Sequence, residues 1–116
     1  MHKIGILLVS ALAAAASVPA IAEGAGNFVL VNGLPGAISD VSIRRAGGND
    51  WKPLSVTPAP GARGNIQFKD SECAYDIRAT VAGSGPTTWA EINLCDVKSI
   101  TLKRDASAGA WVDYDQ

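Results

Sequence analysis

Short runs of alternating apolar and polar residues, separated by turns rich in glycine and proline, set the tightest limit on how this chain can fold. The clearest run covers residues 73–81, and its alternation has the period of two that marks a half-buried strand. The residues that this run would place on one face are Cys73, Tyr75, Ile77, Ala79 and Val81. Strands are predicted at 27–32, 39–45, 51–56, 65–69, 73–81, 88–94, 99–103 and 110–114. Seven or eight short strands without helical periodicity favour an all-β fold, a small β-sandwich rather than a barrel.

Three of these runs carry further information. Segment 27–32 is apolar on both faces, which suits a central strand, whereas Pro53 makes 51–56 an irregular edge strand because proline cannot donate to a ladder. Segment 88–94 ends with a conflict, since Cys95 falls on the face opposite to Ile92. Either a bulge shifts the alternation, or the strand ends at 94 and Cys95 bends inward from the turn.

The first 22 residues are typical of a cleavable signal peptide. A cationic start at 1–3 precedes an apolar run at 4–16, Pro19 breaks the helix, and 20–22 supply a small-any-small cleavage site before Glu23. The alternative is a membrane anchor, but spanning a bilayer needs roughly 18 to 20 unbroken apolar residues. We therefore expect a signal peptide at 1–22 and one β domain at 23–116, working in the periplasm or outside the cell.

The charge and the histidine content exclude several functions. Loss of Lys3 leaves nine basic and eleven acidic side chains, without the clustered cationic face that nucleic-acid binding requires. A second apolar stretch that could hold a membrane is also missing from the sequence. The only histidine, His2, lies in the leader, so Ser-His and Cys-His nucleophile pairs and histidine metal sites are excluded. We expect no enzymatic activity and no cofactor.

Cys73 and Cys95 are the two cysteines, and both lie in the exported part. In an oxidising compartment such a pair predicts a disulfide. A metal site would need three or four ligands, and a reactive thiol is the remaining alternative. In the chain-entropy model a bridge that closes a loop of about 22 residues stabilises the fold by roughly 3 kcal/mol.

Several short elements also form a recognisable pattern. They are Asn32, 38–43, Trp51 with Leu54, 60–61, the run Cys73-Ala74-Tyr75-Asp76-Ile77-Arg78, Trp89, and 92–95. In these elements the chain resembles a group of small, mostly uncharacterised secreted bacterial proteins with a Cys-x-Tyr-Asp-x-Arg strand. The resemblance implies an exported β domain and supplies no activity.

The sequence offers three candidates for contact with a partner, namely Trp51, Arg44 and Arg45. Trp51 follows a glycine-containing loop, so its indole either anchors a partner or caps the core. Asp76 and Arg78 lie two residues apart on one strand face, so they are expected to pair with each other or with Glu91 across the sheet. Trp89 is expected in the core or near the bridge.

We therefore expect a non-enzymatic binding or envelope-accessory module whose partner is an envelope or extracellular protein or a glycan. The alternative is a small protein inhibitor of a hydrolase. Such an inhibitor would present loop 46–52 or the proline-rich loop 57–64 to the enzyme, since a stiff loop lowers the entropy cost of docking.

The export prediction is tested by the intact mass of the secreted protein. Cleavage after Ala22 predicts a mature chain that begins at Glu23. A secreted form whose mass still includes the leader would contradict it.

Overall fold

The computed structural model describes residues 24–115, so the expected signal peptide at 1–22 lies outside the described residues. Within 24–115 the chain forms eight strands and no helix, and it contains no helix long and apolar enough to cross a membrane. The strands are β1 (Phe28–Asn32), β2 (Ile38–Arg45), β3 (Lys52–Pro53), β4 (Arg63–Ile66), β5 (Ala74–Val81), β6 (Gly85–Asn93), β7 (Ser99–Asp105) and β8 (Gly109–Asp115).

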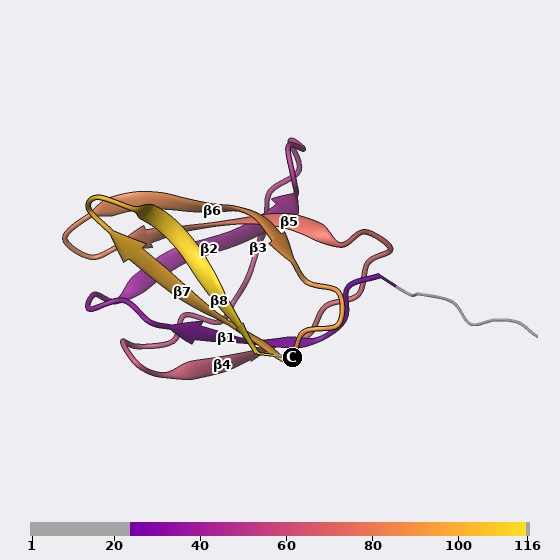
Figure 1. Cartoon of the computed structure of the whole chain (residues 1–116), viewed down its shortest axis with the longest axis horizontal. Coiled ribbons are helices and arrows are strands. Elements are labelled where there is room, and N and C mark those ends of the chain that lie inside the picture. The colour runs from indigo at the N-terminus through magenta and orange to yellow at the C-terminus, as the bar shows by residue number, and fades with distance from the viewer. Residues whose placement is uncertain (1–23, 116) are drawn as a thin grey trace, which may run out of the picture.

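The strands form two four-stranded sheets, in the orders β4-β1-β7-β8 and β3-β2-β5-β6, which face each other as a sandwich (Figure 1). The all-β prediction is therefore confirmed. β1 lies inside its sheet, antiparallel to β4 and parallel to β7. The side chains on its inner face are buried and those on its outer face are partly buried, as expected for a strand that is apolar on both faces. β3 is an edge strand of two residues beside β2, so the irregular edge predicted around Pro53 is also present.

The core lies between the two sheets, where inward residues of every long strand meet. Leu30 of β1, Ile77 of β5 and Leu102 of β7 are completely buried. Trp89 of β6 is 1% exposed, and its Nε1 donates a hydrogen bond of 2.8 Å to the Lys103 carbonyl oxygen. That bond satisfies the one polar atom of the indole, so the prediction that Trp89 belongs to the core is confirmed.

Of the two alternatives for Cys95, the structure has the early strand end, because β6 stops at Asn93 and Cys95 lies in the turn beyond it. A bulge is present in β6, but it lies upstream of Ile92. Tyr75 pairs with Ile92 but Ile77 pairs with Trp89, so Asp76 alone faces two residues of β6. The extra residue lets both Trp89 and Ile92 point inward. Glu91, which lies in the bulge, adopts a left-handed conformation with φ 56°. Such a conformation costs free energy in a residue other than glycine and persists where neighbouring contacts hold it.

The predicted disulfide is present and joins Cys73 to Cys95. Its position corrects one expectation, because Cys73 does not share the buried face of β5. The strand begins only at Ala74, and Cys73 is exposed just before it. Cys95 lies beyond the end of β6 and is half-buried. The bridge thus ties two strand ends at the surface, next to the 2.8 Å bond from the Leu94 N–H to the Cys73 carbonyl oxygen.

Removing the bridge should cost roughly 2–5 kcal/mol of unfolding free energy. The double variant Cys73→Ala/Cys95→Ala tests this without leaving an unpaired thiol, and urea denaturation measures the loss. Thiol labelling of the unfolded but unreduced wild-type protein should detect no free sulfhydryl. Two reactive thiols, or a double variant as stable as the wild type, would contradict the assignment.

Candidate functional site

The carboxylate of Asp76 organises the outer face of the β3-β2-β5-β6 sheet. Asp76 points away from the core, yet the residue is only 3% exposed. Its Oδ1 accepts a hydrogen bond of 2.9 Å from the Glu91 N–H, which the bulge turns toward it. Its Oδ2 accepts bonds from Arg44 Nε at 2.8 Å and from the Gly47 N–H at 3.2 Å. Strand β6, strand β2 and the β2–β3 loop therefore converge on one side chain.

Two opposing effects set the pKa of Asp76. Burial raises the pKa, because a charged carboxylate is less stable away from water. The hydrogen bonds from Glu91, Arg44 and Gly47, together with the charge of Arg44, favour the ionised form and outweigh burial. The pKa of Asp76 therefore lies below its usual range, and the group is negatively charged at neutral pH.

Arg44 extends this network into the β2–β3 loop, residues 46–51. Its Nη1 donates a hydrogen bond of 2.8 Å to the Gly48 carbonyl oxygen, while its Nε holds Asp76. Gly47 has a φ of 75°, a left-handed conformation that suits glycine, and this places its N–H toward Asp76. The loop is thus fixed by the side chains of two strands.

Trp51 lies at the end of this loop, between two arginines of the outer sheet face. The guanidinium carbon of Arg44 is 4.4 Å from the indole centroid, and that of Arg78 is 4.1 Å away. Both distances are within the range of cation–π attraction. The indole is partly exposed, and its described neighbours are the two guanidinium groups.

This arrangement also corrects the expected pairing of Asp76. The sequence pointed to Asp76 and Arg78 pairing with each other or with Glu91, but the salt bridge joins Asp76 to Arg44, directly opposite on β2. Glu91 contributes its backbone N–H to Asp76. Arg78 stacks on Trp51 and forms no salt bridge within residues 24–115. Sequence reasoning missed Arg78 as part of this site, although its spacing from Asp76 places both on one strand face.

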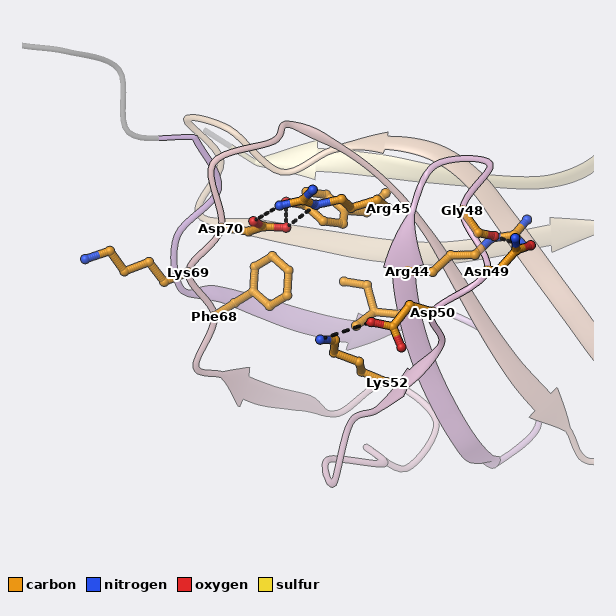
Figure 2. Close-up of a pocket in the computed structure, with 11 residues that line it drawn as sticks. Arg44, Arg45, Gly48, Asn49, Asp50, Lys52, Phe68, Lys69 and Asp70 are labelled. Carbon is orange, nitrogen blue, oxygen red and sulfur yellow. Dashed lines mark hydrogen bonds and ion pairs between the residues drawn. The ribbon is translucent and has the colours of Figure 1, made fainter.

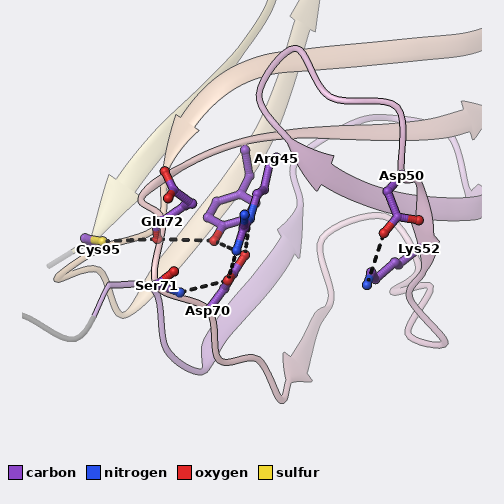
Figure 3. A network of polar contacts seen from close by, with 8 residues as sticks. Arg45, Asp50, Lys52, Asp70, Ser71, Glu72 and Cys95 are labelled. Atoms are coloured by element: carbon purple, nitrogen blue, oxygen red, sulfur yellow. Dashed lines mark hydrogen bonds and ion pairs between the residues drawn. The ribbon is translucent and has the colours of Figure 1, made fainter.

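Arg45, the third candidate, belongs to a separate network at the end of the sandwich (Figure 3). Its Nε and Nη2 donate bonds of 2.9 and 2.6 Å to the two carboxylate oxygens of Asp70. The buried Tyr75 hydroxyl donates to the same carboxylate at 2.7 Å. These bonds from Arg45 and Tyr75 hold the pKa of Asp70 well below its usual range. The structure thus brings Arg44 and Trp51 together and assigns Arg45 to the opposite side of its strand.

A cleft of about 390 Å³ lies between these two networks (Figure 2). One wall is the β2–β3 loop with Asn49 and Asp50, and the other is the segment with Lys69 and Asp70. Ile43, Phe68 and Tyr75 also line it. The Phe68 ring packs edge-to-face on Tyr75, with centroids 5.1 Å apart, which fixes the ring inside the cleft.

Comparisons of the chain with known protein families, with curated proteins and with solved structures give no match. The chemistry of the site is therefore read from its own side chains. Within residues 24–115 no cluster of three or more histidine, cysteine, aspartate or glutamate side chains is arranged to hold a metal ion. The arrangement presents a fixed loop, a stacked indole and a cleft with charged walls.

The role of Asp76 predicts how stability depends on pH. Its folded-state pKa lies below the unfolded value of about 3.9, so between the two values the folded protein binds fewer protons than the unfolded chain. The free energy of unfolding should therefore fall as the pH drops below about 4. Asp76→Asn should make this decline shallower, and at pH 7 it should cost roughly 2–3 kcal/mol, because hydrogen bonds to a charged group are lost.

Urea denaturation at a series of pH values measures both effects. Asp113→Asn is the matched control, because Asp113 is exposed on β8 and forms no salt bridge within residues 24–115. Asp70, whose pKa is also lowered, keeps part of the acid dependence in this variant. A decline with pH as steep as that of the wild type would therefore mean that Asp76 does not contribute to it.

Proposed function

We propose that this chain is an exported, non-enzymatic binding module of the periplasm or the cell exterior. It contacts its partner, an envelope or extracellular protein or a glycan, through the β2–β3 loop and Trp51. The observation that carries this proposal is the partly exposed indole held between Arg44 and Arg78 on an outer sheet face. An aromatic ring that served only to stabilise the fold would contribute more to the free energy of unfolding in the core, where Trp89 lies.

Two properties of the loop support this function. Tryptophan and arginine are enriched among the residues that contribute most to binding energy at protein interfaces. The loop is also held in one conformation by Asp76 and Arg44, which bond Gly47 and Gly48. A binding loop that is already ordered loses less conformational entropy when its partner docks.

A second observation favours the alternative of a hydrolase inhibitor. The proline-rich loop at 57–62 is held by the buried Asn32, whose Nδ2 donates to the Pro58 carbonyl oxygen at 3.1 Å. The backbone of Asn32 also bonds Gly61 at 2.8 Å and Ala62 at 3.0 Å. This gives the loop the rigidity that a protein inhibitor needs, at the end of the sandwich opposite to the β2–β3 loop (Figure 1).

Capture of envelope and extracellular components by the immobilised mature domain tests the proposed function. Trp51→Ala should abolish or strongly reduce capture while lowering stability only slightly. The matched control is Trp111→Ala, since Trp111 is 41% exposed but lies on β8 of the other sheet. Trp89→Ala should do the reverse and lose roughly 3–5 kcal/mol of stability as a buried aromatic.

Two results would contradict the proposal. One is a loss of more than about 3 kcal/mol on Trp51→Ala, which would make the indole a core residue. The other is capture that survives Trp51→Ala but is lost when Pro58 and Pro60 are replaced by alanine. Together with inhibition of a captured hydrolase, this second result would favour the inhibitor alternative.

A further inference from the structure

The cleft beside the β2–β3 loop carries a charge opposite to that of the rest of the chain. Four basic side chains line it, Arg44, Arg45, Lys52 and Lys69, against two acidic ones, Asp50 and Asp70. Residues 24–115 contain nine basic and ten acidic side chains, so five basic and eight acidic groups lie outside the cleft. Asp76, which bonds Arg44 from outside the lining, reduces the excess of positive charge to one. The cleft is therefore a weakly cationic region on an acidic protein.

The four basic side chains of the cleft differ in how firmly salt bridges hold them. Arg45 makes a two-pronged bond to Asp70, and Arg44 is held by Asp76. Lys52 is only loosely paired with Asp50 at 3.3 Å, and both side chains are largely exposed. Such surface pairs contribute little and exchange readily for a better partner. Lys69 forms no salt bridge within residues 24–115.

The positions of the two lysines suit a ligand that crosses the cleft. Lys52 comes from β3 and Lys69 from the opposite wall, and Figure 2 shows them on either side of the Phe68 ring. The partly exposed Phe68 ring supplies an apolar surface between the two lysines, and the buried Ile43 also lines the cleft. A complementary ligand therefore carries negative charges on both sides of an apolar group.

We propose that this cleft binds a short acidic segment of a partner polypeptide, with an aliphatic or aromatic side chain placed against Phe68. This rests on the proposed function, because it names the chemical class of the partner that the binding module recognises. Aspartate or glutamate side chains of the segment pair with Lys52 and Lys69, and the apolar side chain between them covers the exposed part of the ring. A polypeptide offers this combination within a few consecutive residues.

The surrounding charge separates this ligand from other anions. A long polyanion, such as a nucleic acid or a sulfated glycan, would extend past the cleft and meet the acidic remainder of the surface. An uncharged glycan would leave the excess positive charge of the cleft uncompensated. A short segment with few negative charges avoids the acidic remainder of the surface and still compensates the positive charge of the cleft.

The test uses the intact mature domain with its disulfide and a short fluorescent peptide, blocked at both ends, in which a leucine is flanked by glutamates. The matched peptide has glutamine in place of each glutamate, and a heparin fragment serves as the polyanion. We expect the glutamate peptide to bind about tenfold or more tightly than the glutamine peptide, with an affinity that falls as salt is added.

Lys69→Glu should lower the affinity for the glutamate peptide about tenfold, whereas Lys69→Arg should retain it. The control Arg104→Glu makes the same charge reversal at an exposed site on β7, outside the cleft, and should leave the affinity nearly unchanged. Since both lysine variants alter an exposed side chain, their melting temperatures should match the wild type, which separates binding from folding.

Equal affinity for the two peptides, or equal weakening by Lys69→Glu and Arg104→Glu, would overturn the proposal. Tighter binding of the heparin fragment that depends on Lys69 would assign the cleft to an anionic glycan and would also overturn it. If capture of a partner depends on Trp51 but the glutamate peptide does not bind, the proposed function stands, and only the proposal that the cleft binds an acidic segment is refuted. If no capture depends on Trp51 and the glutamate peptide does not bind, both the proposed function and the proposed acidic ligand are refuted.

Discussion

Asp76 places a full negative charge beneath the outer surface of a sheet, where water is nearly excluded and every lone pair needs a donor. The protein supplies these donors from three directions, through a guanidinium on β2, a loop N–H, and a β6 N–H exposed by a bulge. Each donor restricts the segment that provides it. The left-handed Glu91, the ordered β2–β3 loop and the orientation of Arg44 are therefore consequences of a single buried carboxylate.

Two consecutive arginines then perform different tasks because a strand alternates its side chains between faces. Arg44 points to the outer face, where it bonds Asp76 and stacks on Trp51. Arg45 lies just past the core and closes the end of the sandwich through Asp70 and Tyr75. The cleft lies between these two arrangements, so both of its walls are fixed by salt bridges that belong to the fold itself.

The pattern of apolar and polar residues predicted most of the architecture, because it depends only on which residues face the core. Alternation located most of the strands, the uniformly apolar segment 27–32 indicated the central place of β1, and Pro53 indicated the irregular edge at β3. Pairing across strands was harder, because it depends on register. A bulge beside Asp40 shifts β2 by one residue against β5, and only the resulting register puts Arg44 opposite Asp76. The exposure of Cys73 was missed for a similar reason, since alternation does not indicate where a strand begins.

The four edge strands have a consequence for how the protein behaves at high concentration. An open strand edge can pair with another chain, and long, flat, apolar edges lead to aggregation. β3 is only two residues long and contains Pro53, and β4 has four residues. β6 carries Pro86 and is interrupted by the bulge at Glu91, and β8 carries Asp113 between its two aromatic residues and ends at Asp115. Each sheet thus ends in a strand that is short, interrupted or charged, which protects a two-sheet sandwich against edge-to-edge association into fibrils.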